Sequence, residues 1–233
     1  MTTAEQKRDE LLRLAKRRKS DRLPPHRNLS DFHNGYYECD HVSPWSISAC
    51  NVDAEVMIIG QDWVSWNVLE REPDEKRQER QRTGQDSSSQ TNTNLREFLE
   101  YMGIQFCETY ATNVFPFIKL GNKSAPIRSR DLVSCAKTYA LPQIEIVCPR
   151  MAICLGKATF NAVCRAAGLR PTEWRRARLP GPHTRICGVE IYGLPHPTSR
   201  GINNAGGKEI VVRSWEVLGE YLREIRSRGH RRS

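Results

Sequence analysis

The sequence lacks any long apolar run and any paired-cysteine motif. No segment of its 233 residues approaches the roughly 20 consecutive apolar residues that cross a bilayer, and the start, MTTAEQKRDE, has no apolar signal region. The eight cysteines include no CxxC pair, which argues against a zinc ribbon or a compact disulfide framework. We therefore expect an intracellular protein with reduced thiols, no membrane partner, no bound metal and no other cofactor.

Familiar nucleotide and hydrolase motifs are also missing. The chain has no P-loop, GxGxxG, HExxH or GxSxG. Nucleotide hydrolases, dehydrogenases, zincins and α/β-hydrolases therefore lose their usual sequence support. A length of 233 residues fits one domain with extensions.

Positive charge is in excess and gathers at the two ends of the chain. The sequence has 36 Lys and Arg against 27 Asp and Glu, a formal charge of +9. We expect a basic N-terminal arm over residues 1–25, a domain over 26–226 and a basic tail over 227–233. Residues 1–22 are predicted to form either a basic helix or a disordered arm. Pro24-Pro25 would end a helix at this point. Such ends can neutralise nucleic-acid phosphates, or serve only as solvated tails.

Short buried strands alternate with helices along the domain. This alternation predicts an α/β fold with three α/β/α layers and a mainly parallel four-stranded sheet. A charged, polar insertion at about 70–93 is expected to be exposed. The predicted strands are residues 55–59, 109–114, 150–155 and 186–194, and the clearest helices are residues 94–102, 131–146 and 210–222.

Polar side chains follow three of these strands, where ligands bind in parallel sheets. Asp62 is able to orient a water or face a developing cation, and Asn113 offers both a hydrogen-bond donor and an acceptor. His196, held between two prolines, is able to donate to an oxyanion. Taken singly, each residue has an alternative role as a cap, a turn residue or packing.

Four motifs in order carry a resemblance that covers residues 55–221. Gly60-Gln61-Asp62 resembles the GQDPY motif of uracil-DNA glycosylases, and Ala111-Thr-Asn-Val114 resembles the strand with their uracil-reading asparagine. Pro149-Arg-Met-Ala-Ile-Cys-Leu-Gly156 is similar to a strand and turn of the bacterial iron–sulfur branch. Leu194-Pro-His-Pro-Thr-Ser199 resembles the HPS motif before the DNA-intercalating loop. The chain thus resembles the uracil-DNA glycosylase superfamily.

The resemblance implies hydrolysis of the N-glycosidic bond of uracil in single- or double-stranded DNA, the first step of base excision repair, by a monomer in the bacterial cytoplasm or nucleoid. Asp62 and His196 would be catalytic. The implied substrate-binding residues are Gln61, Trp63, Asn113 and Phe115. The implied DNA-binding residues are Gly156, Lys157, Thr198, Ser199 and Arg200, the last at the place of a leucine wedge.

The chain also departs from these patterns. Trp63-Val64 replaces the Pro-Tyr whose tyrosine excludes thymine, and the stacking face for uracil is left open among Trp63, Trp66 and Phe115. Phe117 stands near the place of a cluster cysteine and only Cys135 matches one, so no iron–sulfur cluster is expected. A non-hydrolytic protein of the same fold that binds uracil-DNA or a nucleotide is the alternative.

Overall fold

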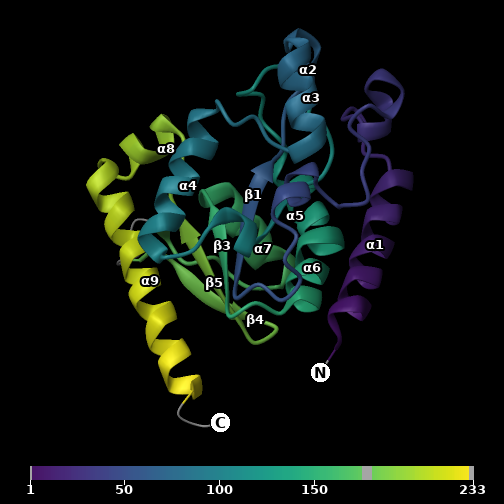
Figure 1. Ribbon diagram of the computed structural model, residues 1–233. Helices are drawn as coiled ribbons and strands as arrows, with labels where there is room; N and C mark the ends of the chain where they lie inside the picture. Colours follow the sequence, from purple (N-terminus) through teal and green to yellow (C-terminus); the bar gives the residue numbers. More distant parts are fainter. Residues whose placement is uncertain (1, 175–179, 231–233) are drawn as a thin grey trace.

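A five-stranded sheet forms the centre of the molecule, whose computed structural model describes residues 2–174 and 180–230 (Figure 1). The order across the sheet is β2-β1-β3-β5-β4, with β4 antiparallel to β5 and every other pair parallel. The fold is therefore α/β with a mostly parallel sheet, as predicted, but it has five strands and not four. The strands are β1 (Val56–Asp62), β2 (Tyr110–Phe115), β3 (Met151–Leu155), β4 (His183–Ile186) and β5 (Val189–Leu194).

The strand missing from the sequence prediction is β4. The sequence predicts one strand over residues 186–194, but Cys187 and Gly188 have φ values of 50° and 81° and join β4 to β5 as a hairpin. Positive φ at both central residues is typical of a type I′ turn. Only Ile186 of β4 is buried, so this edge strand lacks the apolar signal that marks the central strands.

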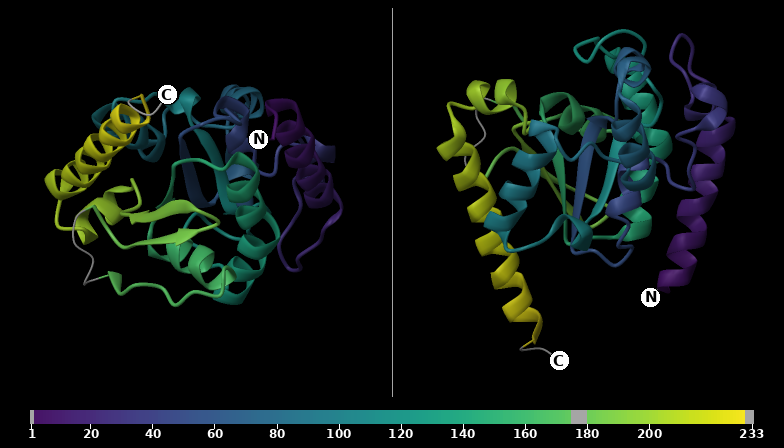
Figure 2. Two further views of the ribbon diagram at one scale, coloured as in Figure 1. Left: turned by 90° about the horizontal axis from the view of Figure 1, so that it is seen from below. Right: turned by 45° about the horizontal axis from the view of Figure 1, so that its top comes forward.

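The side chains of β1 alternate between two hydrophobic cores, one on each face of the sheet. Val56 and Ile58 pack in the core with α4 (Gln90–Met102) and α9 (Lys208–His230). Met57 and Ile59 pack in the other, with α5 (Ser129–Cys135), the π-helical turn η5 (Ala136–Ala140), α6 (Leu141–Val147) and α7 (Lys157–Ala166). Figure 2 shows these two helical layers on opposite sides of the sheet. Burial on both faces explains the uninterrupted apolar run of β1.

The basic N-terminal segment is a helix, α1 (Ala4–Ser20), which lies against α6 (Figure 2). Of the two forms that the sequence allows, helix and disordered arm, the structure has the helix. Arg18 is fully buried and lies 2.5 Å from the Glu38 carboxylate. The Lys7 ammonium donates to the Val147 carbonyl at 3.1 Å. These two cations therefore hold α1 on the domain.

The charged segment at 70–93 is folded. It contains α3 (Asp74–Thr83), between α2 (Trp66–Arg71) and α4. Arg80 of α3 is buried, and its Nη2 lies 2.6 Å from Oε1 of Glu72. The expectation of an exposed segment is wrong for Arg80, because a buried carboxylate balances its charge.

The remaining elements are short, and the predicted basic tail overlaps the last helix. Residues 227–230 belong to α9, whereas 231–233 lie outside the described residues. Among the helices described, none is long and apolar enough to cross a bilayer. The short elements are η1 (Leu29–Asp31), η2 (His33–Gly35), η3 (Pro44–Ser48), η4 (Phe106–Glu108) and α8 (Ser199–Asn204).

Candidate active site

A cavity of about 310 Å³ opens at the carboxyl end of the sheet. From β1 the chain goes to β2 on one side and returns through β3 on the other, and ligands of open α/β sheets bind beside such a reversal. The cavity brings together Asp62 at the end of β1, Asn113 in β2 and His196 directly beyond β5. Three polar side chains that lie up to 134 positions apart in the sequence therefore share one site.

The Asn113 amide is held in place from two sides. Asn113 is 3% exposed, and the Ser43 hydroxyl donates to its Oδ1 at 2.6 Å. On the neighbouring strand Gly60 is paired with Asn113, and a Cβ on Gly60 would lie 2.4 Å from Asn113 Nδ2. A side chain at position 60 would therefore displace the amide, which explains the glycine before Gln61-Asp62.

Both oxygens of the Asp62 carboxylate have partners. Gln61 donates from Nε2 to Oδ1 at 3.1 Å, and the Lys119 ammonium lies 3.0 Å from Oδ2. The side chains of Asp62 and Lys119 are 14% and 6% exposed, so water screens this pair weakly. Gln61 is one of the predicted site residues, whereas Lys119 is not. The only sequence signal for Lys119 is one cation in the apolar run Phe117-Ile-Lys-Leu120.

His196 lies at the cavity wall, where two glycines approach it. A Cβ on Gly156 would lie 3.5 Å from His196 Cβ, and one on Gly201 would lie 2.1 Å from the His196 carbonyl oxygen. Burial lowers the pKa of His196, Asp62 opposes this shift, and Lys123 and Lys119 add to it. The imidazole is therefore neutral at neutral pH and carries one N–H donor.

Tryptophans supply the aromatic wall of the cavity. Trp45 and Trp63 both line it. The Trp63 indole donates from Nε1 to the Gly84 carbonyl at 2.7 Å, and the Arg80 guanidinium lies 5.6 Å from its ring centroid. The segment after α3 thus fixes Trp63, whereas Trp45 comes from η3 and was not among the predicted site residues.

Two of the three aromatic candidates for stacking lie away from the cavity lining. Phe115 is fully buried, with its ring 4.8 Å from that of His26 and 5.7 Å from that of Phe117. Trp66 packs edge-on against Phe32 at 5.1 Å. Alternation along β2 alone would place Phe115 on the same side as Asn113, two residues before it, but Phe115 instead packs in the core with Val114 and Phe117.

The segment after α3, together with the first turn of α4, supplies a large share of the cavity lining. This contribution is not among the sequence predictions, because a polar run gives no apolar periodicity that would place it over the site. The cavity residues that follow α3 are Gly84, Gln85, Asp86 and Ser89, and those in the first turn of α4 are Thr91 and Asn92.

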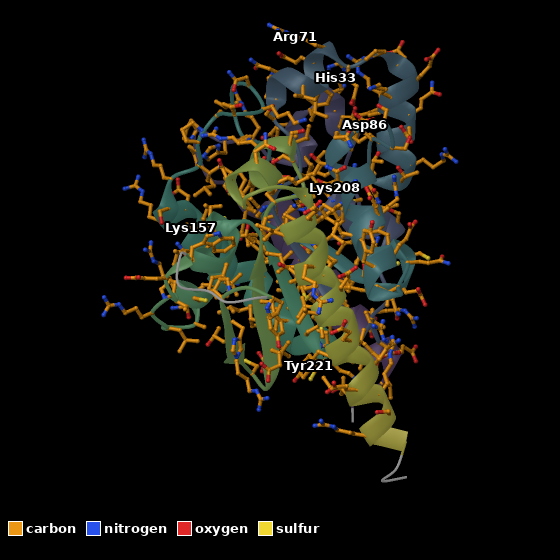
Figure 3. The ribbon with its side chains drawn as sticks, turned by 90° about the vertical axis from the view of Figure 1, so that its left-hand side faces the viewer. His33, Arg71, Asp86, Lys157, Lys208 and Tyr221 are labelled. Carbon is orange, nitrogen blue, oxygen red and sulfur yellow. The ribbon has the colours of Figure 1, made fainter. Side chains whose placement is uncertain are left out.

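The predicted DNA-binding residues lie at the edge of the cavity and beyond it. Thr198 lines the cavity and caps α8, its hydroxyl accepting from the Gly201 N–H at 3.2 Å. Ser199 and Arg200 form the exposed first turn of α8, after the cap. Gly156 has a φ of 88° and turns the chain into α7 at Lys157, which lies well apart from Asp86 (Figure 3).

Lys157 borders a different hollow, on the outer side of α7. That hollow is also lined by Arg165, Arg170 and Trp174. Lys157 is thus separated from the cavity that holds the polar triad.

Metal ligands do not gather in the part of the chain that the structure describes. No group of three or more His, Cys, Asp or Glu residues there is placed to hold a metal ion. All eight cysteines are free, and burial raises the pKa of the Cys135 thiol to about 12.

The site combines a paired carboxylate, a fixed amide and a neutral imidazole, with aromatic side chains at its wall. Such a set suits the binding of a planar polar heterocycle and a reaction that separates a cation from an anion. The sequence model of the Uracil DNA glycosylase superfamily matches residues 47–219, which include Asp62, Trp63, Asn113 and His196 but neither Ser43 nor Trp45. No curated protein matches the chain. With the match spanning well over half of its length, the chain belongs to the uracil-DNA glycosylase superfamily.

Proposed function

We propose that the protein releases uracil from DNA by hydrolysing its N-glycosidic bond, leaving an abasic site and so beginning base excision repair. Superfamily membership supports a glycosylase-type activity on DNA in general. The observation that carries the specific proposal is the convergence of Asp62, Asn113 and His196 in one cavity. In this proposal the cavity of about 310 Å³ receives the target base, which a glycosylase must take out of the duplex.

Asn113 reads the base. In this proposal its Oδ1 accepts from uracil N3–H and its Nδ2 donates to O4. Cytosine presents the reverse pattern at the same two positions, so its groups would go unpaired in the buried site. The Ser43 hydroxyl supports this orientation, because it donates to Oδ1 and leaves Nδ2 for the base.

Asp62 and His196 act on the two charges that develop as the bond breaks. The sugar becomes a cation, which the Asp62 carboxylate stabilises while it orients the attacking water. The base leaves as an anion, and the neutral His196 donates a hydrogen bond to its O2. One such donor is worth about 10²–10³ in rate. The lowered pKa of His196 supports this role, since a neutral imidazole keeps an N–H without requiring acidic conditions.

Aromatic and cationic groups complete the proposed complex. We assign uracil stacking to Trp63, since Phe115 and Trp66 pack elsewhere. Gly156, Lys157, Thr198, Ser199 and Arg200 contact the DNA on either side of the flipped nucleotide. Action as a monomer is part of this proposal.

Incubation with a uracil-containing oligonucleotide, followed by alkaline cleavage of abasic sites, tests this function. We expect strand scission at the uracil position, with a loss of at least about 100-fold in Asp62→Asn. The control is Asp40→Asn, because Asp40 is an exposed carboxylate whose lysine partner lies 2.7 Å away at the surface. Tight binding of the uracil oligonucleotide without scission would instead establish the non-hydrolytic alternative.

A further inference from the structure

The buried ion pair between Lys119 and Asp62 is the least expected feature of the cavity. The Lys119 ammonium lies 3.0 Å from Asp62 Oδ2 and also donates to the Lys123 carbonyl at 2.9 Å. Its side chain is only 6% exposed. An ammonium that is withdrawn from water and makes two such contacts is fixed in position, unlike a surface lysine.

The backbone fixes Lys119 relative to the end of β1. Ser65, three residues after Asp62, pairs with Lys119 through an isolated parallel bridge. The Trp66 N–H donates to the Lys119 carbonyl at 2.9 Å. The start of α2 and the segment after β2 are therefore joined at the point where the lysine side chain reaches the carboxylate.

Two side chains together set the orientation of the Asp62 carboxylate. Gln61 holds Oδ1 and Lys119 holds Oδ2, so rotation of the carboxylate breaks one contact or the other. A bound nucleotide would displace water from the cavity, and a carboxylate without a partner is then strongly disfavoured. A cation at contact distance supplies the charge balance that water supplies in the open cavity.

We infer that Lys119 is a positioning residue that holds the Asp62 carboxylate in its reactive orientation and balances its charge once the flipped nucleotide has filled the cavity. This inference rests on the proposed function. Lys119 acts through Asp62 and does not touch the DNA. A phosphate contact is better assigned to Lys123, whose side chain is exposed and which also lines the cavity.

A double-mutant cycle on uracil release separates these two roles. Lys119→Met is expected to slow single-turnover cleavage about 10- to 100-fold, as expected for a reacting group displaced by about 1 Å. The dissociation constant for the uracil oligonucleotide should stay within about twofold, because no DNA contact is removed. In an Asp62→Asn background the same substitution should have little further effect, since the group on which Lys119 acts is gone.

Two more variants make the test specific. Lys119→Arg keeps the cation and should recover part of the cleavage rate that Lys119→Met loses. If thermal melting shows that Lys119→Met is misfolded, Lys119→Arg replaces it in the test. In that case Lys119→Arg should cleave more slowly than wild type, with unchanged affinity for DNA. Lys208→Met is the matched control, because Lys208 forms a lysine–carboxylate pair with Glu97 at 2.7 Å that is exposed on α9 (Figure 3). It should cleave at the wild-type rate.

Three results would contradict the positioning role of Lys119, and each points to a different explanation. Equal losses in the wild-type and Asp62→Asn backgrounds, or a loss confined to DNA affinity with a weaker salt dependence, would make Lys119 a phosphate contact and overturn the inference. Wild-type cleavage by a folded Lys119→Met would overturn it while the proposed function stands. Absence of uracil release by the unmodified protein would overturn both.

Discussion

Removal of one hydroxyl, in Ser43→Ala, should loosen the base-reading amide. Ser43 Oγ donates to Asn113 Oδ1 at 2.6 Å and accepts from the Trp45 N–H at 3.3 Å. If the amide turned over, Oγ would face two donors, and its own proton would have no acceptor. Ser43 therefore favours the one amide orientation that matches uracil.

The expected size of the effect follows from burial. Ser43 is fully buried and Asn113 is 3% exposed, so water does not replace the lost hydrogen bond. Leaving a buried polar group unsatisfied costs about 1–3 kcal/mol. At about 1.4 kcal/mol for each factor of ten, kcat/KM for uracil should fall about 5- to 150-fold. Discrimination against cytosine should narrow as well, because a reversed amide presents the complementary edge to that base.

The assay compares kcat/KM on matched uracil and cytosine oligonucleotides. Ser46→Ala is the control, since Ser46 lies in η3, three residues after Ser43, and donates to the Ala111 carbonyl of the same strand at 2.6 Å. Among the described residues, no hydrogen bond joins Ser46 to Asn113. It should lower thermal stability and leave the uracil-to-cytosine ratio unchanged. If Ser43→Ala retains the wild-type ratio, the hydroxyl does not orient the amide and the reasoning is wrong.

Three further outcomes are expected. Burial lowers the pKa values of His196, His41 and His26, so below about pH 6.5 the unfolded chain binds more protons than the folded chain. The free energy of unfolding, measured by urea titration, should therefore be fully retained above about pH 6.5 and decrease as the pH falls below that value. It should level off below the folded-state pKa values. Arg18→Met should lower the free energy of unfolding by about 3 kcal/mol in the same titration, because it leaves the Glu38 carboxylate without its cationic partner. A change below about 1 kcal/mol would show that the ion pair contributes little to stability. Arg200→Ala should slow uracil release from duplex more than from single-stranded DNA in single-turnover assays, since only a duplex has a gap to fill; equal losses on both would make Arg200 an ordinary surface cation.

The sequence predicts a site residue best where a polar side chain lies at the end of a recognisable strand. Asp62, Asn113 and His196 each follow or end a short apolar run, and parallel strands bring such positions to one edge of a sheet. Their convergence was therefore predictable from local patterns alone. Their catalytic roles still depend on the proposed reaction.

The residues that hold this site were not predictable in the same way. Ser43 lies 70 positions before Asn113, in a turn-rich segment without periodicity, and only the fold brings them into contact. Lys119 belongs to no motif. Its position beside Asp62 depends on the bridge between its own backbone and that of Ser65. Phe115 shows the converse case, because it is close to Asn113 in sequence but packs against His26 and Phe117, away from the cavity lining.

The docking of α1 also sets an order of events during synthesis. Lys7 donates to the Val147 carbonyl across 140 positions, so α1 cannot complete its contacts until α6 has been made. At about 5–20 residues per second, that interval is about 7–28 s. During this time Leu11 and Leu14, which later pack on the core, have no partner surface from α6. Closure of the N-terminal helix is thus a late folding step, and nascent chains shorter than about 147 residues should leave α1 open to proteases.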